Sequence, residues 1–210
     1  MRGELIAAAR RTVTEGLGRG TSGNLSVRVG SGFLITPTGL PYESLQPDDL
    51  PLVAPDGSWR GDRAPSSEWR LHRDLYARRP EAGAVVHTHS PFAVALACLR
   101  LELPPFHYLV ARFGGDSVRC AAYATYGTQQ LSDAALVALK GRSGALLANH
   151  GAVVCANRLD RALGLAVELE DLCAQFCRAS QLGQPVLLSR IELAAALAKF
   201  AGYGQPPQQG

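Results

Sequence analysis

The sequence predicts an α/β fold in which helices cover a mostly antiparallel sheet. Apolar residues spaced as on one face of a helix alternate along the 210 residues with short apolar runs that are typical of strands. Several of these runs are joined by only a few residues, as in hairpins, so neighbouring strands are expected to run in opposite directions. The glycines of residues 20–23 lack the spacing of a dinucleotide-binding loop, which argues against a parallel nucleotide-binding sheet.

The first third of the chain predicts one helix, one hairpin and a long irregular segment. Residues 4–17 have the apolar spacing of a helix that ends near Gly16 and Gly18. Residues 24–36 indicate two strands around a glycine-containing turn. Five prolines between residues 41 and 65 exclude a long helix there, although a short strand fits near Leu52 and Val53.

Helices and strands alternate through the rest of the chain. Pro65 is expected to begin a helix to about residue 79, which Ser66 and Ser67 can cap and whose positive end Glu68 complements. Residues 159–181 have the pattern of the longest amphipathic helix. The other helices are expected over residues 91–99 and 129–140 and after a capping box of Ser189 and Glu192, and the strands over residues 85–89, 118–123, 145–149 and 152–155.

Composition and charge exclude several classes of protein. Hydrophobic residues make up 47% and charged residues 19%, which indicates one globular domain over residues 1–210 with a flexible polar tail from about residue 203. The net charge of +3 is small and dispersed, so nucleic acid is not an expected partner. No apolar run reaches the roughly 20 residues of a membrane span, and the N-terminus has no secretory signal. Five cysteines within apolar patterns indicate a reduced, cytoplasmic protein.

A pair of histidines lies at the end of the predicted strand that begins at Val85. His87 and His89 are two residues apart, so in an extended chain they point to the same face and can converge on one point. His150 follows the predicted strand of residues 145–149, which would place it at the rim of the sheet. Three neutral imidazoles with a carboxylate or water are typical of a catalytic divalent metal, usually zinc. The alternative is that these are ordinary polar residues near strand ends.

Two short segments have the composition of anion-binding loops. Glycines flank small hydroxyl residues in residues 20–23, and Thr38 with Gly39 repeats this chemistry after a strand. Such segments let the backbone approach an anion with its N–H groups free. Ser66 and Ser67 at a helix N-terminus offer another seat for phosphate. A plain turn and a simple helix cap would explain each feature equally well.

The other two histidines are interpreted as structural. His72 lies one turn beyond Glu68 on the predicted helix, where it can support a neighbour without binding a ligand. His107 precedes Tyr108 and would point the opposite way in an extended backbone.

Seven short motifs occur in order along nearly the whole chain. They are GTSGNLS (20–26), ITPTG (35–39), SSEW (66–69), HTH (87–89), PPFHY (104–108), YATYGT (123–128) and NHG (149–151). Together they resemble the class II sugar-phosphate aldolases of the L-fuculose-phosphate aldolase type, and the resemblance ends with residues 199–204. It implies a three-layer α/β/α sandwich around a mostly antiparallel sheet. It also implies a ring-like homotetramer with active sites between subunits.

The resemblance implies a role for particular residues of the metal and phosphate sites. Glu68 and the three histidines His87, His89 and His150 match the zinc ligands of these enzymes. The residues that match the substrate-phosphate site are Gly23, Asn24, Thr38, Gly39, Ser66 and Ser67.

Three tyrosines match residues near the substrate. Tyr108 matches a tyrosine that reaches into the neighbouring subunit's site, and Tyr203 matches one on a mobile C-terminal tail that closes over substrate. Tyr126 stands where the fuculose enzyme has phenylalanine near the aldehyde end. The aldehyde specificity therefore stays open.

An enzyme of this type takes part in carbohydrate metabolism. It cleaves a ketose 1-phosphate such as L-fuculose 1-phosphate into dihydroxyacetone phosphate and an aldehyde such as L-lactaldehyde. A divalent metal stabilises the negative charge that cleavage leaves on the ketone oxygens. Glu68 is expected to accept a proton from the substrate, and Tyr108 to exchange one with the aldehyde oxygen. Zinc is the expected metal, although cobalt, nickel or manganese suits the same ligands.

Other members of this fold family stay as alternatives. Sugar-phosphate 4-epimerases, methylthioribulose-phosphate dehydratases and sugar-acid phosphate decarboxylases share the scaffold by resemblance. The epimerases have aspartate where Glu68 stands, which favours an aldolase. A non-enzymatic module like the head of adducin would lack the metal-binding histidines, and all three are present.

Overall fold

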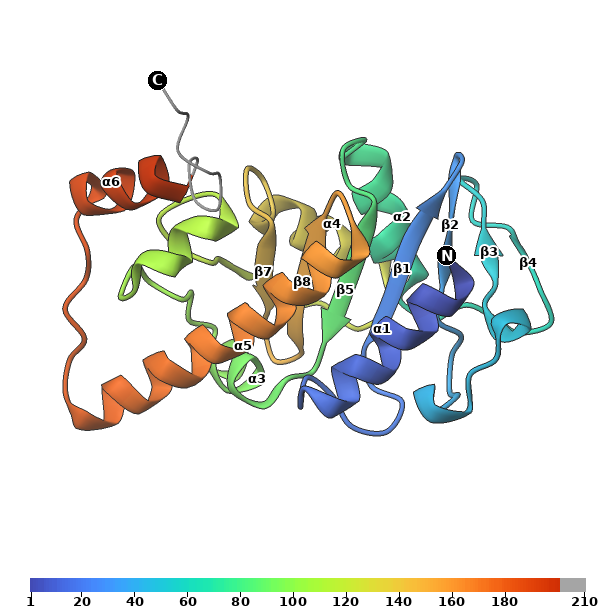
Figure 1. Ribbon diagram of the computed structural model, residues 1–210, viewed down its shortest axis with the longest axis horizontal. Helices are drawn as coiled ribbons and strands as arrows, with labels where there is room; N and C mark the ends of the chain where they lie inside the picture. The colour runs from blue at the N-terminus through green and yellow to red at the C-terminus, as the bar shows by residue number, and fades with distance from the viewer. Residues whose placement is uncertain (201–210) are drawn as a thin grey trace, which may run out of the picture.

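A computed structural model describes residues 1–200, and these build one eight-stranded sheet with helices on both faces (Figure 1). The order across the sheet is β4-β3-β2-β1-β5-β8-β7-β6, and every neighbouring pair is antiparallel except β6 and β7. The mostly antiparallel sheet predicted from the sequence is therefore confirmed. The strands are β1 (Asn24–Val29), β2 (Gly32–Ile35), β3 (Leu52–Val53), β4 (Trp59–Arg60), β5 (Ala84–Thr88), β6 (Cys120–Ala121), β7 (Gly144–Leu147) and β8 (Gly151–Ala156).

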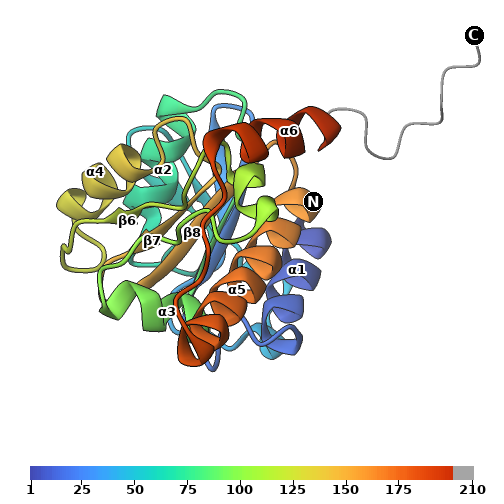
Figure 2. The ribbon, with the colours of Figure 1, turned by 90° about the vertical axis from the view of Figure 1, so that its left-hand side faces the viewer.

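Helices complete the predicted three layers. One face of the sheet carries α1, α3 and α5, and the other carries α2 and α4 (Figure 2). The last helix, α6, packs against the short 3-10 helix η3. The helices are α1 (Arg2–Thr14), α2 (Trp69–Arg78), α3 (Pro91–Cys98), α4 (Gln129–Ala138), α5 (Leu159–Leu182) and α6 (Arg190–Phe200), and the 3-10 helices are η1 (Tyr42–Ser44), η2 (Pro47–Asp49) and η3 (Tyr108–Phe113).

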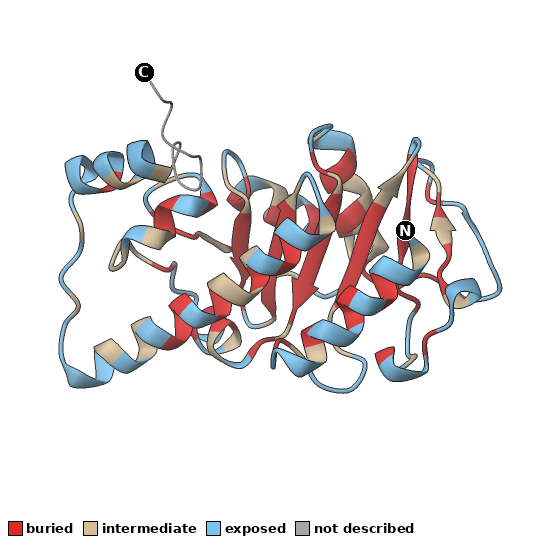
Figure 3. Cartoon of the chain, in the orientation of Figure 1, coloured by how far each residue is buried: buried red, intermediate tan, exposed pale blue. Residues whose placement is uncertain are grey.

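The central strand β5 is buried along its whole length because helices cover both of its faces (Figure 3). Alternate residues point to opposite faces, so Val86 packs toward α1, α3 and α5 while Val85 packs toward α2 and α4. His87 shares the face of Val85. The face between the sheet and α2 therefore receives the imidazole at the end of β5.

The start of α2 differs from the sequence prediction. The helix begins at Trp69 rather than at Pro65, and neither serine caps its N-terminus. The backbone explains this difference: Ser66 donates its N–H to the Thr36 carbonyl, so residues 65–66 continue an extended pairing instead of a helical turn. The Ser66 hydroxyl accepts a hydrogen bond from the Glu68 N–H at 3.3 Å. Glu68 thereby sits at the junction of an extended segment and a helix.

Other expected elements are confirmed with shifted ends. The strand expected over residues 118–123 forms only at Cys120–Ala121, and the first helix lies at Arg2–Thr14 instead of residues 4–17. The capping box at α6 is present, since the Ser189 and Glu192 side chains each accept from the other's backbone N–H.

The single domain expected over residues 1–210 stays a prediction. Its tail from about residue 203, including Tyr203, lies outside the described residues. All five cysteines are free. Among the described helices, none combines the length and the apolar character that crossing a membrane requires.

One partly buried carboxylate joins the two helices of the site-bearing face. Asp74 of α2 accepts hydrogen bonds from Gln129 Nε2 at 2.6 Å and Ser132 Oγ at 2.7 Å, both from α4, and from Arg73 Nε at 2.7 Å. Burial alone would raise the pKa of Asp74, but these three hydrogen bonds outweigh it and lower the pKa. Asp74 is therefore more easily ionised in the folded than in the unfolded chain.

We expect Asp74→Asn to destabilise the protein by about 1–2 kcal/mol at pH 7, because the amide places a donor against groups that already donate. A carboxyl whose pKa is lowered on folding stabilises above its unfolded pKa and loses this contribution as pH falls through the folded pKa. The difference between variant and wild type should therefore shrink below about pH 4. Denaturant unfolding at a series of pH values measures it.

Asp133→Asn is the matched control, because exposed Asp133 accepts one hydrogen bond from Gln129 within its own helix. We expect this control to cost less than about 0.5 kcal/mol at any pH. Equal losses in the two variants, or a loss for Asp74→Asn that does not depend on pH, would contradict the bridging role.

Candidate active site

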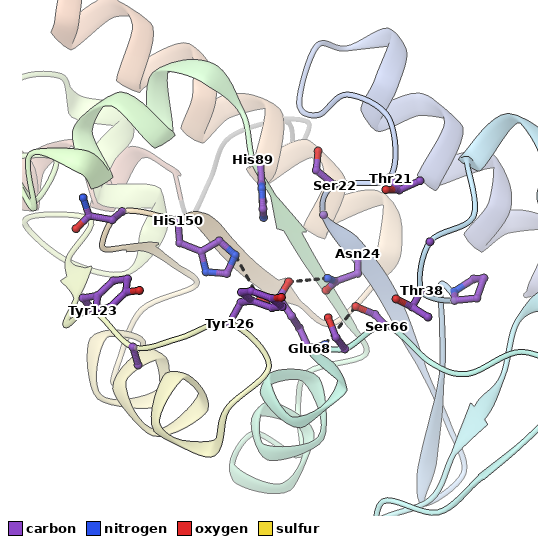
Figure 4. A pocket seen from close by; sticks show the side chains of 16 residues that line it. Thr21, Ser22, Asn24, Thr38, Ser66, Glu68, His89, Tyr123, Tyr126 and His150 are labelled. Carbon is purple, nitrogen blue, oxygen red and sulfur yellow. Dashed lines mark hydrogen bonds and ion pairs between the residues drawn. The ribbon is translucent and has the colours of Figure 1, made fainter.

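Four potential metal ligands meet at one end of the central strands. His87 is in β5, His89 lies just beyond it, and His150 lies in the turn between β7 and β8. Glu68 precedes α2 and points into the same space as His89 and His150 (Figure 4). One ligand atom from each of the four residues lies within 4.8 Å of all the others. The structure thus brings together the four residues that the sequence singled out as a metal site.

Strand pairing explains why these distant residues meet. In the register of β5, His87 lies opposite Asn24 of β1 and Val153 of β8. His150 reaches the site because Asn149 adopts a left-handed backbone with φ +55°, a conformation that asparagine tolerates better than most residues. Arg100 Nε donates to Asn149 Oδ1 at 3.0 Å and holds this turn. The turn is therefore built to present His150.

The nitrogen atoms that face the site carry lone pairs. His87 Nδ1 donates to the Ala152 carbonyl at 2.9 Å, which leaves Nε2 without a proton in the neutral ring. That Nε2 lies 2.9 Å from His89 Nε2 and 3.1 Å from Glu68 Oε2. His150 Nε2 lies 3.4 Å from Glu68 Oε1. Ligands about 2.1 Å from a tetrahedral metal are roughly 3.4 Å apart, so these separations suit one shared dication.

The pKa values of the four residues shift in different directions. Burial is the main cause that lowers the pKa of His89 and of His150 to about 4, so both rings are neutral near pH 7. Burial by itself would lower the pKa of His87 and raise that of Glu68. Their mutual attraction outweighs burial in both residues, with the result that His87 has a raised pKa and Glu68 a lowered one.

One buried oxygen is left without a partner. Among the described residues, Glu68 Oε1 is buried and accepts no hydrogen bond, whereas Oε2 accepts one from Asn24. An ionised carboxylate oxygen in this state costs free energy unless a cation or a donor compensates it. Three imidazole nitrogens and one such oxygen form the ligand set of a catalytic divalent metal. The residues present therefore fit a metal ion.

All six predicted phosphate-site residues line the same cavity as the metal ligands. The cavity has a volume of about 350 Å³ and lies between the β1 entrance, the loop after β2 and the segment before α2 (Figure 4). Among its described lining residues there is no lysine or arginine. The residues that it brings together are Gly23, Asn24, Thr38, Gly39, Ser66 and Ser67, with Glu68, His89 and His150.

The Asn24 side chain is already engaged. Its Nδ2 donates to Glu68 Oε2 at 2.9 Å, and its Oδ1 faces His72 Nε2 at 2.5 Å. His72 is fully buried, which lowers its pKa to about 3, with the charge of His87 acting in the same direction. The structural role expected for His72 thus takes the form of a hydrogen bond to Asn24. The residue spacings on α2 and β1 indicate that His72 and Asn24 lie on facing surfaces, but the sequence motifs did not reveal this contact.

The predicted tyrosines lie in different places. Tyr126 is exposed and lines the cavity, together with Tyr123, which the sequence analysis did not select. Tyr108 does not line it. Instead Tyr108 begins η3 and stacks on His107 and on Phe200 of α6. Within one chain, Tyr108 therefore lies outside the cavity that Glu68, His89 and His150 line.

The structural role expected for His107 is consistent with its contacts. His107 Nδ1 accepts a hydrogen bond from the Leu109 N–H at 3.2 Å and caps η3. It has no place in the cavity.

Gly23 closes the floor of the cavity against β5. Its backbone has φ +83°, and a Cβ there would lie 2.7 Å from the His87 carbonyl oxygen. We expect Gly23→Ala to unfold the local junction of β1 and β5 and to weaken zinc binding at least tenfold, because the clash displaces His87. Competition with a coloured chelator measures the zinc affinity, and denaturant unfolding measures the stability.

Gly20→Ala supplies the matched control. Gly20 also has a left-handed backbone, with φ +63°, but a Cβ there meets nothing within 4 Å. The control should cost only the backbone strain of about 1–2 kcal/mol and leave zinc affinity unchanged. Similar zinc affinities for the two variants would show that the close approach of Gly23 to His87 does not shape the site.

Comparison with known proteins identifies the family. Residues 3–177 match the family described as Class II Aldolase and Adducin N-terminal domain. A 5-methylthioribulose-1-phosphate/5-deoxyribulose-1-phosphate aldolase of Rhodospirillum rubrum is 50% identical over 208 residues, which cover 99% of this chain and 94% of that protein. The L-fuculose phosphate aldolase of Escherichia coli is 44% identical over 190 residues, which cover 90% of this chain and 88% of that one.

A solved structure agrees with the sequence matches. The structure of an L-fuculose 1-phosphate aldolase superposes with a TM-score of 0.91 at 38% identity and covers 95% of each chain. The expected resemblance is therefore confirmed over almost the whole chain. Class II aldolases depend on a metal ion, and the four gathered side chains are able to bind one. This chain belongs to the class II aldolase and adducin family, and within it the protein is a class II aldolase, a lyase.

Proposed function

We propose that this aldolase reversibly cleaves a ketose 1-phosphate into dihydroxyacetone phosphate and an aldehyde. The observation that supports this most strongly is that one cavity is lined both by three of the four potential metal ligands and by the hydroxyl- and glycine-rich segments suited to a phosphate. Candidate substrates are L-fuculose 1-phosphate, which yields L-lactaldehyde, and 5-deoxyribulose 1-phosphate. The names of the Escherichia coli and Rhodospirillum rubrum relatives support these two choices.

Glu68, His87, His89 and His150 are the proposed ligands of one zinc ion per chain. Zinc accepts imidazole nitrogens with a carboxylate oxygen, and Co²⁺, Ni²⁺ and Mn²⁺ are chemically possible in the same site. When bound, such an ion acts as a Lewis acid that stabilises negative charge on the ketone oxygens as the carbon–carbon bond breaks. The protein supplies the remaining chemistry through its own side chains.

The phosphate group is proposed to lie against Gly23, Asn24, Thr38, Gly39, Ser66 and Ser67. Because no described cationic side chain lines the cavity, hydroxyls and backbone N–H groups would hold the dianion. Ser66 and Ser67 lie just before the N-terminus of α2, which is the positive end of the helix. Binding energy from the phosphate, which does not react, then fixes the position of the carbons that do.

Two side chains are proposed to move protons. Glu68 is kept ionised by its neighbours and has a free Oε1 in the cavity, so it can accept a proton from the substrate carbon in the condensation direction. Tyr108 is proposed to exchange a proton with the oxygen that belongs to the aldehyde. Tyr126 at the cavity wall is proposed to contact the aldehyde end, and Tyr203 to close over the substrate.

The placement of Tyr108 supports the proposal of a homo-oligomer, and the family resemblance alone makes a tetramer the expected form. In the single chain Tyr108 lies on η3, outside the cavity that holds Glu68. The Tyr108 residue is 47% exposed on the surface of the single chain. A proton transfer by Tyr108 therefore requires that a neighbouring subunit supply it. No membrane and no nucleic acid enter this proposal.

Purified protein loaded with zinc tests the reaction directly. We expect incubation with L-fuculose 1-phosphate or 5-deoxyribulose 1-phosphate to release dihydroxyacetone phosphate, measured by a coupled reduction, and chelator treatment to abolish it reversibly. Formation of an epimerised or dehydrated sugar phosphate without dihydroxyacetone phosphate, for every ketose 1-phosphate tried, would overturn the proposal.

For Glu68→Gln we expect kcat to fall by at least about 100-fold while inorganic phosphate still binds, because the amide cannot accept a proton. The overall fold should persist, since the isosteric side chain occupies the same space. Circular dichroism checks the fold, and competitive inhibition by phosphate checks the binding site. Full activity would remove Glu68 from the mechanism.

Mixed oligomers test the position of Tyr108. Glu68→Gln and Tyr108→Phe should each be nearly inactive alone. If Tyr108 acts across a subunit contact, unfolding and refolding the two variants together at equal amounts should restore about a quarter of wild-type activity through sites that draw one intact residue from each chain. Separately refolded and then combined samples are the control. No recovery in mixed oligomers would show that Tyr108 does not act across a subunit contact.

A further inference from the structure

A buried chain of four hydrogen bonds runs from the metal cluster into the core. Glu68 Oε2 is bonded to Asn24 Nδ2 at 2.9 Å, and Asn24 Oδ1 to His72 Nε2 at 2.5 Å. His72 Nδ1 is bonded to Ser26 Oγ at 2.6 Å, and Ser26 Oγ to the Tyr76 hydroxyl at 2.8 Å. All five side chains are buried. A network of this kind is costly to bury unless every member is satisfied, as it is here apart from Glu68 Oε1.

The residue spacings of a helix and a strand produce this series of hydrogen bonds. Glu68, His72 and Tyr76 are four residues apart, so they lie on one face of α2, which begins directly after Glu68. Asn24 and Ser26 are alternate residues of β1 and share the sheet face toward α2. Four residues of a helix rise about 6 Å and two residues of a strand about 6.8 Å, so the two series interdigitate.

The chemistry of the side chains fixes which group donates and which accepts in each of the four hydrogen bonds. The Glu68 carboxylate can only accept, so the Asn24 amide must turn its N–H₂ group toward it. Asn24 Oδ1 then faces His72 and needs a proton on Nε2. A neutral imidazole with that proton accepts at Nδ1, so the Ser26 hydroxyl donates there, and the Tyr76 hydroxyl donates to Ser26.

The Asn24 amide is the vulnerable link. Rotation of its amide by 180° would turn Oδ1 toward Glu68 Oε2, and two acceptors at 2.9 Å would repel each other. On the side of Asn24 away from Glu68, only the proton on His72 Nε2 favours the observed amide orientation, because Oδ1 accepts it there. Phe33 stacks on the His72 ring, with centroids 6.4 Å apart, and holds its plane.

We propose that His72 is a positioning residue for Glu68: through Asn24 it holds the carboxylate so that Oε2 is hydrogen-bonded beside His87, while Oε1 stays free and lies 3.4 Å from His150 Nε2. This inference rests on the proposed role of Glu68 as a metal ligand and base. His72 touches neither substrate nor metal and acts only through Asn24. It therefore differs from His87, His89 and His150, which offer their nitrogens to the site itself.

Two substitutions separate polarity from packing. Gln at position 72 retains one donor and one acceptor, whereas Leu retains neither and fills similar apolar space. We expect His72→Leu to bind zinc at least about tenfold more weakly than wild type, and His72→Gln to recover most of that loss. Chelator competition on the metal-free protein measures both affinities, and denaturant unfolding measures both stabilities.

Tyr76→Phe is the control at the far end of the chain. It removes only the hydroxyl that donates to Ser26, so Ser26 still donates to His72 and the Asn24 amide keeps its orientation. We expect its zinc affinity to stay within about twofold of wild type, while its stability falls by the loss of a buried hydrogen bond. If Tyr76→Phe lowers the stability but not the zinc affinity, a loss of zinc affinity in His72→Leu reports the position of Glu68 and not a general loss of stability.

Nitrogen-15 spectra of metal-free wild-type protein give a test that needs no variant. His72 should appear as the neutral tautomer with the proton on Nε2 and with Nδ1 as acceptor. A proton on Nδ1 instead, or equal zinc affinities for His72→Leu and His72→Gln, would overturn the inference. Failure of the protein to cleave any ketose 1-phosphate, with these results intact, would count against the proposed function alone.

Discussion

The pairing of β5 with β1 on one side and β8 on the other is the constraint on which the site depends. This register places Asn24 beside His87 and brings the Ala152 carbonyl of β8, which fixes the His87 ring, next to β5. A slip of one residue would turn every side chain of β5 to the opposite face of the sheet. The layers on both faces prevent such a slip, because Val85 and Val86 fill different cores. Packing of apolar residues thus determines where a polar cluster forms.

The chemistry of the cavity comes from a contrast between its two sides. On the side of β5, neutral imidazoles and an ionised carboxylate concentrate electron pairs in a buried space. On the side of the loops around Gly23 and Thr38, the cavity is lined by glycines and by hydroxyl-bearing residues. The first side suits a dication and the second a dianion. The proposed ketose 1-phosphate carries both a carbonyl and a phosphate, and thus has a group for each side.

Much of the fold and the metal cluster could be predicted from the sequence, because both depend on local patterns. Strand parity places His87 and His89 together, and short turns between apolar runs indicate antiparallel pairing. The true start of α2 could not be predicted from local signals, because the backbone bond of Ser66 to Thr36 joins segments distant in the chain. The bond between Asn24 and Glu68 spans 44 residues and depends on the same sheet register. The position of Tyr108 follows from the packing of η3 against α6, which has no signature in its own motif.

The register of the sheet also decides when the cluster can exist during folding. His87 and the carbonyl that orients it are 65 residues apart in the chain, and only completed strand pairing joins them. An unfolded chain therefore has no organised ligand set to offer to a metal ion. The free energy of ion binding then counts almost entirely in favour of the native state. A metal ion bound by this cluster would therefore oppose separation of β5 from β8, which carries the carbonyl that orients His87.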